Sequence, residues 1–234
     1  MKIEKILVFI VTYNSSYRLK KILNKLTKLK KRIPFDILIS DDCSTDDTKS
    51  YFPDKKNIFL NINRKNLGYG GNVKNCLKFA INRKYKYAVM IHGDNQYDAK
   101  YIFNLFKKIS NTNYDAVTGS RMINPKNALN GKMPFYKFIG NFVLTKFFNL
   151  VFKTNFTDAH TGLWMYNLNN LNYNFFKDID ENFNFDNQLR IKLVKNKKQI
   201  DEIPIKTYYR NEKSSFHFIY ALKFLLEVSK NIIK

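Results

Sequence analysis

Short apolar runs alternate with amphipathic helical patterns through the first half of this 234-residue chain, and this alternation restricts the fold more than any other feature. The run Ile6 to Val11 is branched or aromatic throughout, which is typical of a strand buried on both faces of a sheet. Residues 15–30 follow with apolar side chains at helical spacing, and Ser15 or Ser16 is the expected cap. The two patterns recur, with strands predicted at residues 35–40, 58–62, 87–91 and 115–119 and helices at 44–51, 72–84 and 99–110. Strands that alternate with helices predict an α/β fold with a mostly parallel sheet and helices on both faces.

The second half of the chain is organised differently. Apolar and aromatic residues recur at helical spacing in residues 133–153, 187–196 and 216–233, and residues 199–206 are strand-like. The segment from Phe156 to Met165 predicts a polar loop followed by a short strand. No stretch approaches the ~20 apolar residues needed to span a bilayer. We expect one domain at residues 1–215 and an amphipathic C-terminal helix at residues 216–234.

Polar, acidic and glycine-containing segments follow the predicted strands at the points where those strands end. They comprise residues 12–14, 41–45, 92–98 and 119–121. In a parallel α/β sheet, ligands bind beyond the carboxyl ends of the strands. The sequence therefore predicts a binding site at this edge.

Asp94 is the expected metal ligand of this site. It follows the fourth predicted strand, and a carboxylate there can hold Mg²⁺ or Mn²⁺, which bridges phosphate oxygens. Gln96 and Asp98 are placed to orient a ligand water or an acceptor. The structural alternative is that Asp94 closes an Asx-turn and caps the next helix.

The pair Asp41-Asp42 ends the second predicted strand. One carboxylate there can accept the N–H of a nucleobase, and its neighbour can reach a ribose hydroxyl. Alternatively, the pair caps the helix after Ser44, with Asp46 and Asp47 near the positive end of that helix.

The turn from Asn66 to Asn72 contains three glycines, which allow backbone amides to approach a ligand or two loops to pass closely. It matches neither the Walker nor the dinucleotide-binding pattern. Arg121, at the end of the fifth predicted strand, either grips a phosphate or forms a surface salt bridge. His92 and His160 are acid–base groups or, more commonly, structural residues.

The net charge of +22 favours polyanionic partners: nucleic acid, anionic lipid headgroups or diphosphates. A solvated lysine surface is the alternative. The sequence contains no zinc-finger spacing, RNP-type signature or basic zipper, so nucleic acid is not an expected partner. Cys43 and Cys76 match no zinc or redox spacing, and we expect reduced thiols in a cytoplasmic protein.

Taken in order, these motifs resemble the inverting glycosyltransferase family 2, whose two-lobed, Rossmann-like nucleotide-binding fold is called GT-A. The matching segments are residues 11–14, 40–46, 66–72, 92–98 and 119–122. Within that family the chain is similar to the dolichyl- or polyprenyl-phosphate sugar synthases, through residues 131–141, 158–162, 185–188, 202–205 and 214–216. The resemblance covers about residues 5 to 220.

The resemblance implies transfer of a sugar, with inversion, from a UDP- or GDP-sugar to a membrane-linked acceptor. That acceptor would be polyprenyl phosphate or a glycan in cell-surface polysaccharide synthesis. Asp94 would bind Mg²⁺ or Mn²⁺, and Gln96 would lie near the acceptor or phosphate. A phosphate acceptor needs no base, whereas a hydroxyl must lose its proton to a carboxylate, for which Asp186 and then Asp158 are expected. The expected nucleotide contacts are Thr12, Tyr13, Asn14, Asp41, Asp42, Gly70, Asn72 and Arg121.

Two departures from the family pattern bear on these roles. His92 stands where most members have the first residue of Asp-x-Asp, which leaves Asp94 as the sole side-chain ligand in the segment. This favours the alternative function, a catalytically idle GT-A protein that binds a nucleotide. Trp164 occupies the position of a usual Arg, which removes one acceptor or phosphate contact.

The expected C-terminal helix carries Lys223, Lys230 and Lys234 beside an apolar face. It either packs on the domain or rests on an anionic leaflet. The second arrangement would place the protein peripherally on the inner face of a membrane.

Overall fold

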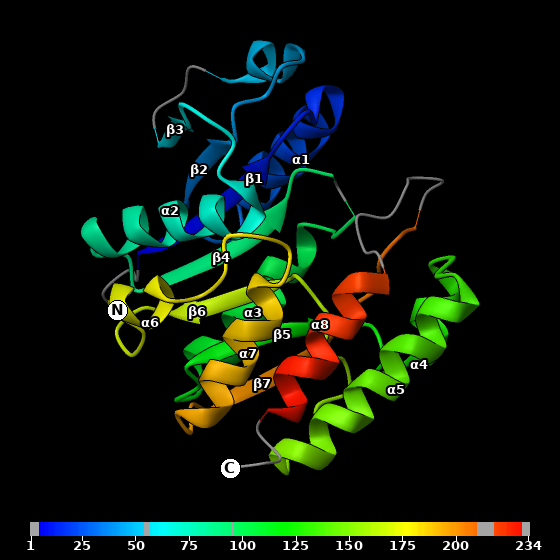
Figure 1. Ribbon diagram of the computed structural model, residues 1–234. Coiled ribbons are helices and arrows are strands. Elements are labelled where there is room, and N and C mark those ends of the chain that lie inside the picture. Colours follow the sequence, from blue (N-terminus) through cyan, green and yellow to red (C-terminus); the bar gives the residue numbers. More distant parts are fainter. Residues whose placement is uncertain (1–4, 54–56, 95, 210–217, 231–234) are drawn as a thin grey trace.

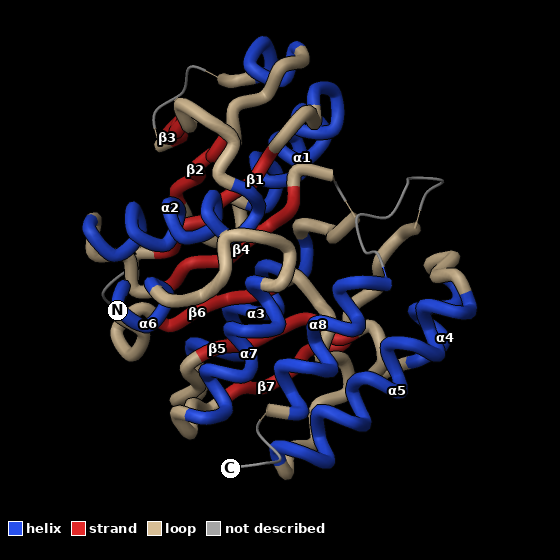
Figure 2. Tube along the Cα trace, in the orientation of Figure 1, coloured by secondary structure: helices blue, strands red, loops and turns tan. Residues whose placement is uncertain are grey.

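The computed structural model describes residues 5–53, 57–94, 96–209 and 218–230. Its strands form one sheet in the order β3-β2-β1-β4-β6-β5-β7, with helices packed on it (Figures 1 and 2). Strand β6 is antiparallel to β4 and β5, and the other neighbours pair in parallel. The strands are β1 (Ile6–Thr12), β2 (Asp36–Asp41), β3 (Ile58–Ile62), β4 (Tyr87–His92), β5 (Ala116–Ser120), β6 (Trp164–Asn167) and β7 (Ile200–Pro204). The predicted mostly parallel sheet is confirmed, and the position of β6 between β4 and β5 is a feature that the sequence did not indicate.

Helices cover both faces of the sheet because neighbouring side chains of a strand point to opposite faces. Val8 of β1 lies in a core formed with α1 and α3, whereas Phe9 lies in a second core formed with α2, α6 and α7. The helices are α1 (Ser16–Leu29), α2 (Gly68–Asn82), α3 (Lys100–Ser110), α4 (Pro125–Asn130), α5 (Phe135–Phe152), α6 (Tyr173–Lys177), α7 (Phe185–Lys195), α8 (Phe218–Ser229) and the 3-10 helix η1 (Asp47–Tyr51).

Helix α8 packs on α5 beside the sheet, as Figure 1 shows. The rings of Phe148 and Phe224 lie 6.0 Å apart in this contact, and Val228 is also buried there. The expected domain boundary at residue 215 and the motif at residues 214–216 lie outside the described residues. None of the helices that the structure describes is long and apolar enough to cross a membrane.

Two helix starts differ from expectation. Ser15 occupies the N-cap position of α1, but its hydroxyl donates to the Tyr13 carbonyl, and the Thr48 hydroxyl accepts the Ser15 N–H at 2.8 Å instead. Helix α2 begins within the glycine-rich segment, at Gly68, rather than after it. A side chain at Gly70 would collide with the main chain at Asp180, so glycine is required where α2 meets that loop.

The strand ends lie together, as expected. Thr12 lies opposite Asp41, and Val11 lies opposite His92. Because β6 runs antiparallel, the loop at residues 158–162 that precedes it arrives at this same edge. The polar segments that follow β1, β2, β4 and β5 therefore lie together at this edge of the sheet.

Candidate active site

The segment after β1 is tied to the segment after β2. The Asn14 carboxamide oxygen accepts the Thr45 N–H at 2.9 Å, and the Asn14 N–H donates to the Ser44 hydroxyl at 2.9 Å. Thr12 is buried, and its hydroxyl has no hydrogen-bond partner within the described residues. The Tyr13 side chain is 49% exposed, so it offers an aromatic surface beside these strand ends.

The two acidic residues after β2 are both buried but have different partners. Asp41 accepts hydrogen bonds from the Ser44 N–H at 3.0 Å and from the Ser44 hydroxyl. Asp42 accepts from the Asn63 side chain and from the Leu67 N–H, both at 2.9 Å. Both Asp41 oxygens accept hydrogen bonds inside the protein, and the expected reach of Asp41 toward a ribose stays a prediction.

Asn72 and Gly70 support the framework beneath the site. The buried Asn72 carboxamide donates to the Ser40 carbonyl at 3.0 Å and accepts from the Ser40 hydroxyl at 2.5 Å. Gly70 lies against the main chain of Asp180, as described above. These contacts show a structural role for both residues, and their expected contact with a nucleotide stays a prediction.

Asp94 is partly exposed, and its Oδ1 accepts the Gln96 N–H at 2.9 Å. The Asx-turn of the structural alternative is therefore present. Asp98 similarly accepts the Lys100 N–H at the start of α3, at 3.1 Å. The hydroxyl of Tyr97 holds the segment in place by accepting the Gly162 N–H at 3.0 Å.

The ligands available around Asp94 fit a metal ion whose coordination shell is completed by substrate phosphates. Among the described residues, no three His, Cys, Asp or Glu side chains are grouped as a ready-made metal site. Mg²⁺ in nucleotide sites is commonly bound by one or two carboxylates together with substrate phosphates. The hard, partly exposed carboxylate of Asp94 meets that requirement once a diphosphate is present.

Three residues far apart in the sequence converge beside this segment. The Tyr69 hydroxyl of α2 donates to Asp186 Oδ2 of α7 at 2.8 Å, and the ring of Tyr69 stacks on His92 at 5.3 Å. His92 Nε2 lies 3.2 Å from the Gly162 carbonyl oxygen. A Cβ atom at Gly162 would lie 2.6 Å from His92 Nε2, so glycine makes this packing possible. His92 is therefore held among aromatic and main-chain groups.

The Asp186 residue is partly exposed, but its carboxylate oxygen Oδ1 is buried. Its Oδ1 has no hydrogen-bond partner within the described residues. Burial raises the pKa of Asp186 to about 6, although the His92 charge, the Tyr69 hydrogen bond and the Arg190 charge oppose the rise. Such a group is largely ionised at neutral pH and still accepts a proton readily.

Arg121 and Asp158 form a buried ion pair. Arg121 Nε donates to Asp158 Oδ2 at 2.7 Å, and Nη2 donates to Asp158 Oδ1 at 2.8 Å and to the His160 carbonyl at 2.9 Å. Arg121 Nη1 donates to the Tyr209 hydroxyl at 2.6 Å. Burial opposes ionisation of Asp158, but Arg121 outweighs it and lowers the Asp158 pKa to about 2. The lowered pKa weakens Asp158 as a base and most N–H groups of Arg121 already have partners, so the expected roles of both residues stay predictions.

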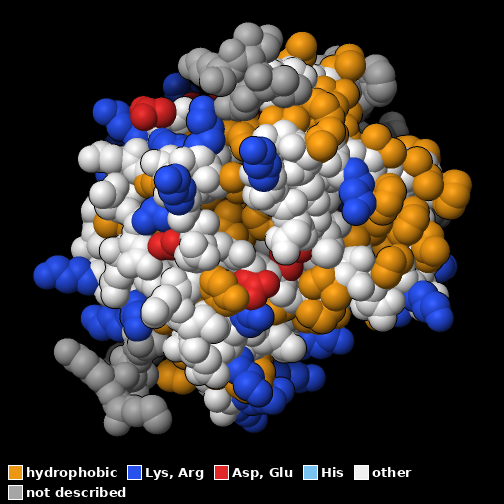
Figure 3. Space-filling model, turned by 90° about the horizontal axis from the view of Figure 1, so that it is seen from below, with side chains coloured by type: hydrophobic (Ala, Val, Ile, Leu, Met, Phe, Trp, Pro, Cys, Tyr) orange, Lys and Arg blue, Asp and Glu red, His pale blue; other side chains and the backbone are white. Residues whose placement is uncertain are grey.

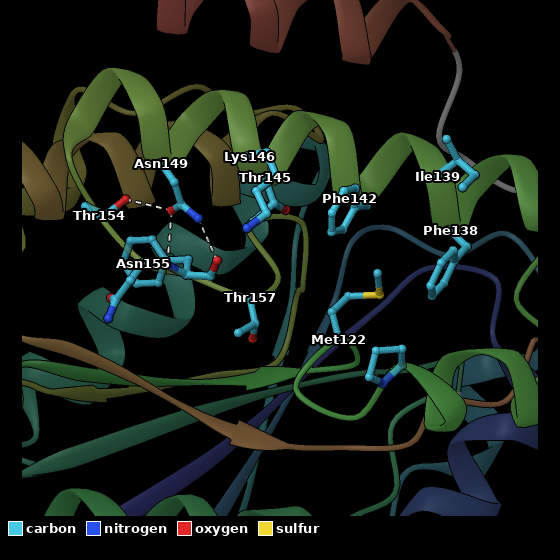
Figure 4. A pocket seen from close by; sticks show the side chains of 12 residues that line it. Met122, Phe138, Ile139, Phe142, Thr145, Lys146, Asn149, Thr154, Asn155 and Thr157 are labelled. Atoms are coloured by element: carbon cyan, nitrogen blue, oxygen red, sulfur yellow. Dashed lines mark hydrogen bonds between the residues drawn. The ribbon is translucent and has the colours of Figure 1, made fainter.

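An apolar groove of about 560 Å³ opens between α5 and the segment after β5 (Figure 4). Phe138 and Phe142 project from α5 toward Met122, which directly follows Arg121. Thr157, next to Asp158, lines the same groove. The groove is therefore lined by the residues next in sequence to Arg121 and Asp158.

No sequence motif indicated that Tyr69, Lys137 or Tyr209 belongs to the site. Tyr69 lies 117 positions from its partner Asp186, and only the glycine-rich turn around it marked the segment. Lys137 lies over the Tyr209 ring at 5.7 Å, beside Arg121. Burial and the Arg121 charge lower the Lys137 pKa, which reflects two neighbouring cations.

The fold is that of an α/β protein of the GT-A type. The sequence model of glycosyl transferase family 2 matches residues 7–174, and the chain belongs to this family. An uncharacterised protein of Methanocaldococcus jannaschii is 28% identical over 242 residues, which cover 97% of both chains. A UDP-N-acetylglucosamine–dolichyl-phosphate N-acetylglucosaminyltransferase of Methanococcus voltae is 29% identical, over 88% of this chain and 87% of the relative.

Solved structures of GT-A glycosyltransferases share the fold. The glucosyl-3-phosphoglycerate synthase of Mycobacterium tuberculosis superposes with a TM-score of 0.66 at 12% identity, covering 98% of this chain and 81% of the other. A structure of the same synthase with Mn²⁺, UDP and glucosyl-3-phosphoglycerate has a TM-score of 0.62 at 12% identity, covering 98% and 77%. These comparisons confirm the fold and the family.

Proposed function

We propose that this protein transfers a sugar, with inversion, from a nucleotide-sugar to polyprenyl phosphate at a membrane surface. On the donor side, Thr12, Tyr13, Asn14 and Asp42 are the proposed nucleotide contacts at the ends of β1 and β2. Asp94 is the proposed ligand of Mg²⁺ or Mn²⁺, which would stabilise the departing diphosphate. The Mn²⁺ and UDP held by one structural relative support this assignment.

The groove beside α5 is the observation that carries the acceptor assignment. Its walls are mostly apolar, which suits an isoprenoid chain, and they include Met122, which follows Arg121 in the sequence. Lys137 is the proposed contact to the acceptor phosphate, because the neighbouring Arg121 is already paired with Asp158. A lipid tail with a phosphate head matches this order of apolar and cationic groups. The dolichyl-phosphate activity named for the Methanococcus voltae relative is consistent with this assignment.

The outer face of α5 supports contact with an anionic membrane. Its large exposed side chains form one stripe at helical spacing, and Figure 3 shows hydrophobic side chains gathered on that side of the molecule. The stripe comprises Phe135, Tyr136, Ile139, Phe142, Val143 and Leu150. Lys132, Lys146 and Lys153 are exposed around it, and Lys223 is exposed on the adjacent α8. Because Ile139 and Phe142 also line the groove, the groove opens on the same surface as the stripe.

A phosphate dianion attacks without a base, and Asp186 is the proposed proton acceptor only for the acceptor phosphate that still carries its second proton. A phosphate monoester loses its second proton near pH 6, which matches the Asp186 pKa of about 6. When the protonated phosphate attacks, its O–H bond breaks toward Asp186 and a new bond forms between that oxygen and the sugar C1. The bond from C1 to the donor diphosphate breaks, and the nucleoside diphosphate leaves. Gln96 remains the proposed contact to the phosphate or acceptor near Asp94.

The test uses purified protein in detergent with Mn²⁺, a panel of UDP- and GDP-sugars, and polyprenyl phosphates of different chain lengths. We expect a lipid-linked sugar from at least one donor. Phe142→Glu places a charge in the groove and should raise the KM for a long-chain acceptor at least tenfold. Phe135→Glu, on the same helix outside the groove lining, should leave that KM unchanged. Equal effects of the two variants would contradict the groove assignment.

Membrane contact is tested separately by sedimentation with vesicles that contain anionic lipid. Phe135→Glu should weaken binding, because the Phe135 side chain is 70% exposed on the stripe. Leu60→Glu changes a side chain that is 48% exposed on β3, at the far edge of the sheet, and should leave binding unchanged. Unaltered binding of Phe135→Glu would exclude the stripe as the contact.

A catalytically idle nucleotide-binding protein is the second candidate. The packing of His92 on Tyr69 and Gly162, in place of a second carboxylate near Asp94, favours it. Calorimetric binding of UDP or GDP without transfer from any donor to any tested acceptor would support this candidate over the transferase.

A further inference from the structure

The start of helix α7 is fastened to the C-terminal helix α8 by one carboxylate. Glu227 is the one acidic residue in the sequence of α8, which lies beside α7 in Figure 1. Its Oε2 accepts from the Asn184 carboxamide at 2.9 Å, and its Oε1 accepts from the Gln188 carboxamide at 2.5 Å. Asn184 stands two residues before Asp186, and Gln188 stands two residues after it. Glu227 therefore binds the chain on both sides of Asp186.

The side chain of Asn184 serves this contact instead of capping its own helix. Asn184 occupies the N-cap position of α7, where an asparagine usually accepts a main-chain N–H of the first turn. Its side chain makes no such bond to that turn, all of which the structure describes. The buried carboxamide instead donates to Glu227 and accepts from the Asn187 side chain at 3.2 Å. The contact with α8 thus takes the place of the ordinary cap, and hydrogen bonds to a carboxylate are stronger than those between neutral groups.

The loop at residues 178–184 is held by the same contact and, on its other side, by α2. The Gln188 carboxamide oxygen accepts the Asp180 N–H at 2.7 Å, so one side chain links α8 to this loop. The Glu181 carbonyl accepts the Gly71 N–H of α2 at 3.1 Å. The loop is therefore fixed between α2 and the α8 contact.

This loop also brings an aromatic ring against the Tyr69 side chain. Phe183 stacks on the Tyr69 ring, with centroids 5.6 Å apart and planes inclined by 8°. The Tyr69 hydroxyl in turn donates to Asp186 Oδ2 at 2.8 Å. Asp186 thus depends on the segment that Glu227 holds in two ways, through the start of α7 and through the Phe183–Tyr69 contact.

We propose that Glu227 is a positioning residue of the acceptor site, through which α8 sets the place of Asp186. This role rests on the proposed function, which places the acceptor phosphate beside Asp186. Helix α8 is kept on the domain by a different contact, because Phe224 and Val228 are buried against α5. Removal of the Glu227 carboxylate should therefore release the start of α7 without detaching α8.

The first test is amide hydrogen exchange followed by mass spectrometry, which needs no activity. Glu227→Ala should raise exchange at least about tenfold in residues 178–186, because the Gln188 side chain that accepts the Asp180 N–H is no longer held. Exchange in β1 and β4 should stay as in the wild type. The control Leu222→Ala shortens a side chain that is 44% exposed on the same helix and should leave residues 178–186 unchanged.

Two further variants separate this role from general stability. Glu227→Gln keeps one acceptor oxygen, so it should raise exchange less than Glu227→Ala and serves if that variant does not fold. Gln188→Met removes the same link from the α7 side, and its effect should add little to that of Glu227→Ala, because both act on one contact. Unchanged exchange in residues 178–186 of Glu227→Ala, or an equal rise in β1 and β4, would overturn the proposal.

The second test is transfer in detergent. Glu227→Ala should lower kcat/KM for the acceptor at least about tenfold, because misplacement of reacting groups is costly. The donor KM should stay within about twofold, because the proposed donor contacts lie at the ends of β1 and β2. Glu227→Gln should recover part of the loss, and Leu222→Ala should transfer as the wild type does. Wild-type transfer by Glu227→Ala would refute the positioning role.

The two tests also distinguish this role from the proposed function. If exchange in residues 178–186 rises as expected but no donor and acceptor yield product, the proposed function fails while the hold of Glu227 on the start of α7 stands. If the wild type transfers sugar and Glu227→Ala matches it in both tests, the proposed function stands and the role of Glu227 fails.

Discussion

Replacing Asp158 with Asn tests whether the Arg121–Asp158 pair is structural or catalytic. The substitution keeps the size of the side chain but leaves the buried Arg121 without its anion. Removing one partner of a buried ion pair typically costs about 3–5 kcal/mol of unfolding free energy. The pKa of Asp158 gives a second measure: a lowering from 3.8 to about 2 corresponds to roughly 2 kcal/mol of stability.

The sign of this pH dependence is fixed by the lowered pKa. Asp158 stabilises the folded state fully above its ordinary value of 3.8, and this contribution is lost as the pH falls toward about 2. Urea unfolding at pH 7 should therefore show a loss of about 3–5 kcal/mol in Asp158→Asn. Between pH 5 and pH 2.5, the difference between wild type and variant should shrink by up to roughly 2 kcal/mol.

The matched control is Asp201→Asn. Asp201 pairs with Lys108 at 2.6 Å, but these side chains are 30% and 39% exposed, so the cost should stay within about 1 kcal/mol. Equal stability of Asp158→Asn and Asp201→Asn would refute the structural role of the buried pair. A stable Asp158→Asn protein that had lost only transfer would instead restore Asp158 as a base.

The remaining predictions concern the cluster around Asp186. Gly162→Ala places a methyl carbon only 2.6 Å from His92 Nε2, which displaces His92, and should lower transfer at least tenfold. The control Gly140→Ala has no atom within 4 Å of the added carbon, so it should leave transfer unchanged and stabilise α5 by up to about 1 kcal/mol. Tyr69→Phe removes a hydrogen bond that lowers the Asp186 pKa, so the acid limb of the rate profile should move to higher pH. Asp186→Asn should abolish that limb, and an unchanged limb would exclude Asp186 as the titrating group.

The sheet could be read from the sequence because its signals are local. Strand β1 is apolar from Ile6 to Val11, and the apolar spacing of α1 predicts a helix that the structure confirms at Ser16–Leu29. The place of β6 could not be read in this way. Its antiparallel pairing with β4 and β5 joins segments about 50 to 80 residues apart, and no local pattern encodes that choice.

The location of the site was also readable, because the polar segments follow strands whose ends share one edge. The hydrogen-bond partners of each side chain could not be predicted from the sequence. Asp41 and Asp42 are adjacent aspartates, yet their hydrogen bonds differ. Asp41 accepts from Ser44, whereas Asp42 accepts from Asn63 and Leu67. Asp158 was expected as a base because sequence gives the residue type and order but not the guanidinium that neutralises it. Burial and pairing decide such roles, and both depend on the tertiary fold.

Metal-assisted transfer at Asp94 is tested by one assay on two variants. Wild-type protein, Asp94→Asn and the control Asp98→Asn are incubated with labelled nucleotide-sugars, polyprenyl phosphate and Mn²⁺, with and without EDTA, after circular dichroism has confirmed the fold. We predict that the wild type forms a lipid-linked product and that EDTA abolishes it. Asp94→Asn should lose at least 100-fold in activity, in keeping with the several kcal/mol of transition-state stabilisation that a metal supplies. Asp98→Asn should retain activity. Undiminished, EDTA-resistant transfer by Asp94→Asn would contradict the account.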